Sequence, residues 1–156
     1  MNIQKSSRHS KITGDATEKL VLYFLSKYGF ECVHVDHTGI DLIARNTVTK
    51  ELMGISVKAR SRIEGTENTP LTISNDNFEK IDSACEAFNC KPYFAIVVDG
   101  NNKILIFLLS KEKLLSKVSG KSVASWGMSP KHIEEYRHDK DIKIIELDYK
   151  MPKNWC

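Results

Sequence analysis

The sequence lacks the long apolar runs on which membrane insertion depends. Its longest strongly apolar run covers residues 104–109, whereas a membrane helix needs about 20 such residues. The amino terminus has no apolar segment of the kind that marks a secretory signal. We therefore expect a cytoplasmic protein without membrane contact.

Cysteine is scarce, with four residues in a chain of 156. None of the four forms a C-x-x-C pair, and no His-x-x-x-His partner lies near them, which disfavours a zinc site. So few cysteines in a chain of this length do not indicate a disulfide framework, so we expect reduced thiols. Cys85 and Cys90 are predicted to be core or helix-end residues rather than metal ligands.

Several catalytic signatures are also absent. The sequence contains no glycine-rich phosphate loop, no G-x-S-x-G elbow and no H-E-x-x-H motif, which argues against the enzyme classes that use them. Neither an internal repeat nor a low-complexity tract is visible. The composition, 41% hydrophobic and 28% charged, is that of an ordinary globular protein. The length suits one domain, which we assign to residues 1–156.

The net charge of +3 is concentrated at one end of the chain. Lys5, Arg8 and Lys11 lie in residues 1–11 without any acid, and the rest of the sequence is balanced. This basic flexible arm could contact phosphates, and the alternative is a solvated terminus without a role.

The pattern of apolar residues predicts alternating helices and strands. Apolar side chains recur at helical spacing from Asp15, a candidate cap, to residue 28 before Gly29. Runs rich in Val and Ile, bounded by turn residues, predict strands. The order through residue 110 is one helix (15–28), three strands (30–36, 40–45, 52–59), a loop (61–74), one helix (75–88) and two strands (93–98, 103–109).

The last third of the chain has a weaker pattern. It predicts a short helix over 110–118, a loop over 119–129, a helix beginning at Pro130 and a strand over 141–147. The whole order predicts an α/β fold with a mixed central sheet flanked by helices. We place the core at residues 12–110 and a C-terminal extension at 119–156.

Three chemically informative residues lie on three consecutive predicted elements: Glu18 on the first helix, Asp41 at the start of the second strand and Lys58 on the third. Because side chains alternate along a strand, Ser56 and Lys58 face the same way, and Arg60 and Arg62 continue that row if the strand does. A lysine in an apolar strand is costly unless it faces a polar cleft.

These residues and their surroundings resemble the PD-(D/E)xK phosphodiesterase superfamily, in its Holliday-junction-resolvase and restriction-endonuclease-like branch. The resemblance covers about residues 12–110 and rests on motifs in the family's order. They are Gly14-Asp15-x-x-Glu18, Gly29-Phe30, Gly39-Ile40-Asp41-Leu42-Ile43-Ala44 and Val57-Lys58. The resemblance implies a restriction-endonuclease-like α-β-β-β-α-β core.

One position departs from the family's pattern, in which Glu or Gln stands two residues before the lysine. Here that residue is Ser56, whose hydroxyl cannot replace the charge of a carboxylate at a Mg²⁺ site. Some restriction enzymes of the superfamily also have Ser there and bring the acid from the following helix. Glu79 is the candidate for that acid, with Asp76, Glu64 and Glu67 as weaker ones.

The resemblance implies a role for each remaining candidate. Asp41, with Glu18 and the carbonyl of Val57, would hold Mg²⁺ or Mn²⁺, and Lys58 would position the attacking water and stabilise phosphoryl charge. Ser56 would lie in the cleft. The cations expected on the DNA backbone are Arg8, Lys11, Arg60 and Arg62. The implied activity is a divalent-metal-dependent DNA endonuclease, and nucleases of this kind often act as homodimers.

Each candidate also has a purely structural interpretation. Glu18 could form a capping box with Asp15, and Glu79 could do the same with Asp76. Asp41 could be a turn residue, and Lys58 could protect an edge strand. Trp126 and Trp155 could stack on bases, although packing is commoner.

Two other functions stay open. Ser56 favours a nuclease-like protein that binds DNA but cleaves it weakly or not at all. The modest net charge leaves open a protein-interaction module that docks through residues 119–156.

Overall fold

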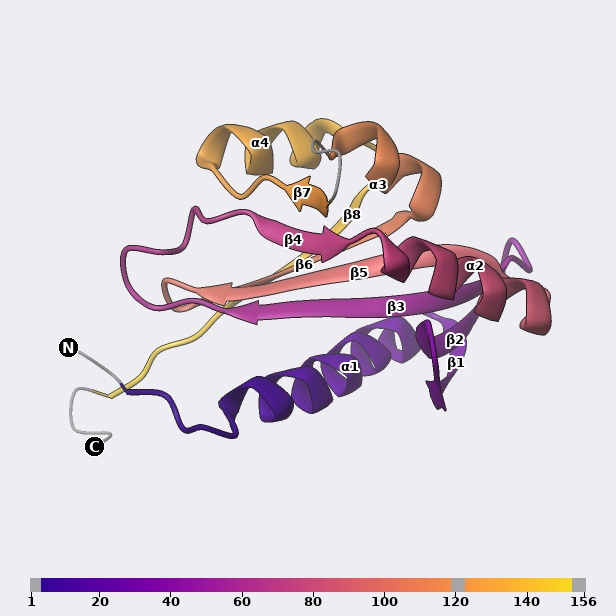
Figure 1. Cartoon of the computed structure of the whole chain (residues 1–156), viewed down its shortest axis with the longest axis horizontal. Coiled ribbons are helices and arrows are strands. Elements are labelled where there is room, and N and C mark those ends of the chain that lie inside the picture. The colour runs from indigo at the N-terminus through magenta and orange to yellow at the C-terminus, as the bar shows by residue number, and fades with distance from the viewer. Residues whose placement is uncertain (1–3, 119–122, 153–156) are drawn as a thin grey trace.

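The computed structural model describes residues 4–118 and 123–152. Helices and strands follow one another along these residues in the order that Figure 1 labels. They are α1 (His9–Lys27), β1 (Phe30–His37), β2 (Ile40–Asn46), β3 (Leu52–Ser61), β4 (Leu71–Ser74), α2 (Asp76–Phe88), β5 (Lys91–Gly100), β6 (Lys103–Ser110), α3 (Lys111–Lys117), β7 (Val123–Trp126), α4 (Pro130–His138) and β8 (Lys143–Asp148). Among them, no helix is both long and apolar enough to cross a membrane.

A six-stranded sheet forms the centre of the fold, in the order β1-β2-β3-β5-β6-β8. Its neighbouring strands are antiparallel except for β3 and β5, which run parallel because α2 and β4 connect them across one face. β4 and β7 form a separate antiparallel pair above that face (Figure 1). The predicted α/β fold with a mixed central sheet is confirmed.

Two apolar cores lie on the two faces of the sheet. On one face α1 places Val21, Phe24 and Leu25 against β2, β3 and β5. On the other face α2, the β4–β7 pair, α3 and α4 cover a larger core (Figure 1). Trp126 is fully buried there and stacks on Tyr136 with ring centroids 4.0 Å apart. Trp126 is therefore a packing residue, and Trp155 lies outside the described residues.

Helix α1 begins six residues earlier than predicted. It starts at His9, so it includes the last residues of the predicted basic arm, and Asp15 lies inside the helix rather than at its cap. Arg8 occupies the N-cap position without a side-chain capping bond. The first turns are polar, so the apolar spacing did not reveal them. The prediction that Asp15 caps this helix is wrong.

Two predicted loops contain strands. β4 and β7 are only four residues long, and they pair Leu71 with Trp126 and Ser74 with Val123, which are far apart along the chain. Such short strands are stabilised by a distant partner and by the core below, which local patterns do not show. The predicted helices of the last third are confirmed, including the start of α4 at Pro130, and the last predicted strand is present as β8.

Candidate functional site

Asp41 lies at the start of β2, directly after the turn that joins it to β1. The turn depends on Gly39, which has φ +100°, and a Cβ there would lie 2.3 Å from the carbonyl oxygen of Lys80 in α2. An L side chain is strained at this φ, and the helix backbone leaves no space for one. Gly39 thereby lets α2 pack directly above the entrance of β2.

A bulge in β1 lies opposite Asp41. The β1–β2 register pairs His34 with Leu42 and then His37 with Ile40, so two residues of β1 stand opposite the single residue Asp41. Bulges of this type locally increase the twist and redirect side chains, and they are common beside active sites. Asp41 thus sits where the regular ladder is interrupted.

The carboxylate of Asp41 is held by β3. Its Oδ2 accepts a hydrogen bond of 2.6 Å from the backbone N–H of Val57. Burial raises the pKa of Asp41 above its usual value, and the charge of Glu18 adds to this effect. The Val57 N–H, Lys58 and His34 act in the opposite direction without cancelling the rise in pKa. A nearby cation would stabilise the ionised form of this carboxylate and lower its pKa.

Lys58 approaches Asp41 from the neighbouring strand. It lies on β3, between β2 and β5, so the alternative that it protects an edge strand is wrong. Gly54, Ser56 and Lys58 alternate onto the face that α2 covers, where the Cβ position of Gly54 meets Cys85. Burial lowers the pKa of Lys58, while the charge of Asp41 raises it. The charges of Asp41 and Lys58 each shift the pKa of the other, so the carboxyl and the ammonium lie near each other on adjacent strands.

Glu18 reaches the site from α1, on the opposite face. Its Oε2 lies 2.7 Å from Nε2 of His34 in β1, and its charge acts on Asp41. The first turn of α1 lies nine residues before Glu18, so Glu18 does not form a capping box with Asp15. Sequence patterns did not single out His34, so this contact was missed. No local pattern reveals it, because the pair joins residues sixteen positions apart.

Ser56 is buried in the floor of this region, with 3% of its surface exposed. The β2–β3 register pairs Leu42 with Ile55, and one further step places Ser56 opposite Asp41. The position where the resembled family has a carboxylate or amide thus holds a buried hydroxyl.

The acid on α2 that acts on Lys58 is Asp76, and its charge raises the pKa of Lys58. Asp76 also binds Lys80, with Oδ2 and Nζ 2.6 Å apart. Glu79 is exposed on α2, and the charges that act on the pKa of Asp41 and Lys58 come from other residues. The structure therefore favours Asp76 over Glu79 as the acid that α2 brings toward the site.

The predicted phosphate-binding cations have different surroundings. Arg8, Lys11 and Arg60 are exposed, and Arg60 lies close enough to Lys58 to lower its pKa. Arg62 instead donates from Nη2 to the carbonyl oxygens of Thr69 and Pro70, at 2.9 and 3.0 Å, and so anchors the loop before β4. Its geometry indicates a structural role, which the continued β3 row did not predict.

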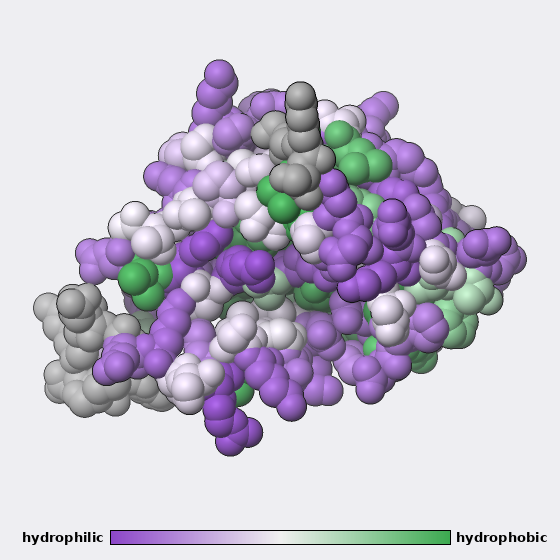
Figure 2. All heavy atoms as spheres, in the orientation of Figure 1, coloured by the Kyte–Doolittle hydropathy of each residue, from purple (hydrophilic) through white to green (hydrophobic). Residues whose placement is uncertain are grey.

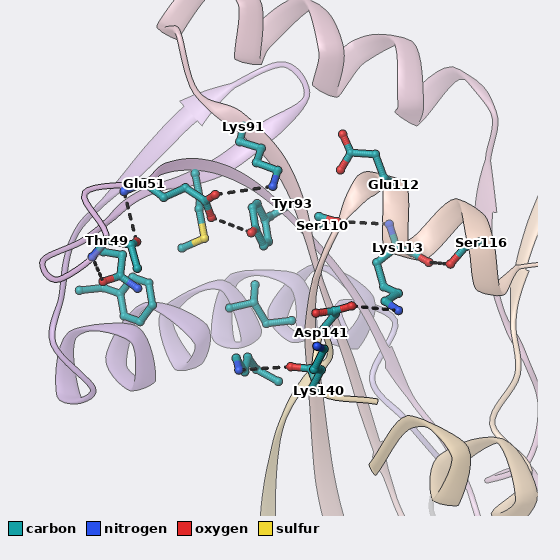
Figure 3. A pocket seen from close by; sticks show the side chains of 15 residues that line it. Thr49, Glu51, Lys91, Tyr93, Ser110, Glu112, Lys113, Ser116, Lys140 and Asp141 are labelled. Carbon is teal, nitrogen blue, oxygen red and sulfur yellow. Dashed lines mark hydrogen bonds and ion pairs between the residues drawn. The ribbon is translucent and has the colours of Figure 1, made fainter. Parts of the chain in front are cut away.

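A cavity of about 610 Å³ lies at the other end of β3 and β5, where Glu51, Lys91 and Tyr93 line it (Figure 3). Its polar groups pair with one another. Tyr93 donates to Glu51 at 2.7 Å, and Lys113 lies 3.2 Å from Asp141. None of the candidate residues lines this cavity, so it is separate from the Asp41 site.

The oxygen atoms around Asp41 suit a hard divalent cation. Asp41 and Glu18 offer carboxylates, and Mg²⁺ usually takes one or two carboxylates while it keeps several waters. Within residues 4–118 and 123–152, no three His, Cys, Asp or Glu side chains gather into a metal-binding cluster. The described residues therefore fit a cation whose coordination shell consists largely of water molecules. They do not form a site in which protein atoms supply every ligand.

Comparison with known proteins identifies the fold. No protein-family model matches the sequence, and the search of curated proteins finds no match. Among solved structures, the chain is similar to Archaeoglobus fulgidus Hjc, a Holliday junction resolvase from an archaeal hyperthermophile, with a TM-score of 0.53. The match covers 70% of this chain and 86% of that one at 19% identity.

The chain has a restriction-endonuclease-like fold. This confirms the predicted fold class, and at 19% identity the likeness extends to the fold alone. The element order α1-β1-β2-β3-α2-β5 is the core that the motifs predicted, with β4 added before α2 and β6 to β8 after it.

Proposed function

We propose that this protein is a divalent-metal-dependent DNA endonuclease that hydrolyses phosphodiester bonds. The observation that carries the proposal is the proximity of Asp41 and Lys58, which lie on the adjacent strands β2 and β3 and whose charges act on each other. Each is half-buried, and burial shifts each pKa toward the neutral form. Perturbed titratable groups that meet in this way are typical of catalytic sites.

The residues divide the chemistry among them. Asp41 and Glu18 would hold the cation, and the Val57 N–H keeps one oxygen of Asp41 fixed while the other stays free of that bond. When bound, Mg²⁺ or Mn²⁺ supplies a Lewis acid that polarises the scissile phosphate. Lys58 would orient the attacking water and stabilise the charge that develops on the phosphoryl oxygens.

Exposed cations extend this site toward the DNA backbone. Arg60 follows Lys58 along β3, and Arg8 and Lys11 lie at the start of α1. We assign phosphate contacts to these three side chains, and we assign Arg62 to loop anchoring because carbonyl oxygens already occupy its Nη2. We further propose that the protein acts in the cytoplasm as a homodimer that cleaves both strands of DNA.

The test is nicking of supercoiled plasmid and of branched DNA with Mg²⁺ or Mn²⁺. Asp41→Asn keeps an oxygen acceptor for the Val57 N–H but removes the charge, and Lys58→Met keeps the length of the side chain. Loss of at least a hundredfold in rate in both variants is expected. Equal rates in all three proteins would refute the proposal, and Lys91→Met, at the distant cavity, is the control variant.

A DNA-binding protein without turnover is the second candidate. Ser56 favours it, because its buried hydroxyl adds no charge beside Asp41. This candidate predicts affinity for DNA that falls steeply with salt concentration, and no cleavage with either metal. Turnover by the wild type that is lost in Asp41→Asn would exclude it.

A further inference from the structure

Within residues 4–118 and 123–152, the side chain of Glu18 forms its hydrogen bond with His34. Its Nε2 lies 2.7 Å from Oε2 of Glu18, while 39% of its side chain and 23% of that of Glu18 are exposed. A contact this short joins β1 to α1 across the edge of the site. In the part of the chain that the structure describes, Glu18 is the one proposed metal-binding residue that hydrogen-bonds to this imidazole.

The position of His34 follows from the bulge in β1. His34 is the last residue in the regular register, opposite Leu42, and the extra residue comes directly after it. His34 therefore stands one position along the ladder from Asp41, and its charge acts on Asp41. The bulge thus places an imidazole beside both carboxylates, at the point where the strand is redirected.

Glu18 needs such a partner for two physical reasons. Its negative charge repels the negative charge of Asp41, so the two carboxylates move apart when no cation lies between them. A glutamate side chain also has several rotatable bonds, and an unrestrained carboxylate loses precision in its geometry. A donor on one oxygen fixes the rotamer and leaves Oε1 available.

We propose that His34 is a positioning residue, which orients the carboxylate of Glu18 toward Asp41 and so determines the cation geometry of the site. The inference rests on the proposed nuclease function. Because Ser56 supplies no charge, cation binding depends on the carboxylates of Asp41 and Glu18, and the orientation of each carries more of the binding. Loss of a partner that orients a ligand commonly costs about 10–100-fold in metal affinity or activity.

The experiment compares His34→Leu with His34→Gln. The amide nitrogen of Gln can replace Nε2 as a donor, whereas Leu keeps bulk and removes the hydrogen bond. We expect His34→Leu to lower kcat for plasmid nicking about tenfold or more, and His34→Gln to recover most of the rate. His37→Leu, on the same strand, is the matched control, since His37 bonds to the carbonyl oxygen of its neighbour Thr38.

A double mutant separates positioning from a general structural effect. In the Glu18→Gln background, His34→Leu is expected to cost little more, because the group on which it acts is already altered. Mn²⁺ affinity, measured by calorimetry, is expected to fall in His34→Leu and to recover in His34→Gln. Additive losses in the double mutant, or unchanged rates and affinities in His34→Leu, would overturn the inference.

Failure of the inference differs from failure of the proposed function. An active wild type whose His34→Leu variant is equally active refutes the role of His34 alone. A wild type that neither cleaves DNA nor binds Mn²⁺ refutes the nuclease function, and the positioning role is lost with it. Far-UV circular dichroism of each variant verifies that the fold is intact in these comparisons.

Discussion

Substitution of Gly39 by alanine tests how α2 is held over the start of β2. Gly39 has φ +100°, and the new Cβ would lie 2.3 Å from the carbonyl oxygen of Lys80 and 2.6 Å from its carbonyl carbon. Both are backbone atoms of a helix, so no side chain can rotate away to make space. The change therefore strains the turn and also displaces α2 from Asp41, two residues further on.

The magnitude has two parts. A non-glycine residue at this φ costs about 1–3 kcal/mol in backbone strain, and overpacking against an element that cannot move freely adds about 1–3 kcal/mol. We expect a total loss of about 2–6 kcal/mol in the free energy of unfolding. Gly65→Ala is the matched control, because Gly65 has φ +85° but nothing lies within 4 Å of its Cβ position.

Urea unfolding followed by fluorescence measures both variants. Gly65→Ala is expected to lose only the strain term, so the difference between the two isolates the contact with α2. Equal losses would show that the backbone conformation accounts for the whole effect and that the α2 contact contributes nothing. The DNA-nicking rate is expected to fall in Gly39→Ala and to stay unchanged in Gly65→Ala.

Three further predictions use the same unfolding assay. Gly14→Ala, inside α1 with nothing within 4 Å of its Cβ position, is expected to stabilise the protein by about 0.5–1 kcal/mol; a loss would contradict the helix start at His9. Asp41→Asn is expected to be more stable than wild type at pH 7 although it is inactive. Because the folded-state pKa of Asp41 is raised, the folded protein holds the proton more tightly, and wild-type stability falls as pH rises above the unfolded pKa of about 3.9. The difference should therefore shrink below about pH 4, and a constant difference would refute this cause. Ser110→Ala removes the acceptor of the Lys113 N–H at the start of α3 and should cost about 1 kcal/mol, whereas exposed Ser116→Ala should cost less.

Local patterns predicted much of the fold for a physical reason. Helices α2 and α4 carry their apolar residues at helical spacing, and α4 starts at Pro130 as the preference of proline for the first helical position suggests. Strand alternation correctly placed Ser56 and Lys58 on one face. These features depend on a residue and its near neighbours, which the sequence displays directly.

Other features depend on tertiary packing and were not predicted. β4 and β7 are strands because they pair with each other over a core, and the polar first turns of α1 carry no apolar spacing. The His34–Glu18 contact requires the β1 bulge, which no motif indicates. The choice between Asp76 and Glu79 depends on how α2 is rotated above Lys58, and the spacing of acids along the helix does not determine that rotation.

The surface and the C-terminal segment bear on the alternative that the protein is an interaction module. Figure 2 shows a mostly hydrophilic face with small, scattered apolar patches. Within the segment 119–156, proposed from the sequence as a docking surface, residues 123–148 contribute Trp126 and Tyr136 to the core and β8 to the central sheet. This segment is an integral part of the fold, which weakens the alternative that it serves mainly as a docking surface.

The central claim is that Asp41, helped by Glu18, binds a divalent cation beside Lys58. Anomalous diffraction from a crystal soaked in Mn²⁺ tests it most directly. The account predicts one strong peak at coordinating distance from the free carboxylate oxygen of Asp41, and no peak there in Asp41→Asn. A wild-type crystal whose only manganese peaks lie elsewhere, or one in which the peak persists in Asp41→Asn, would contradict it.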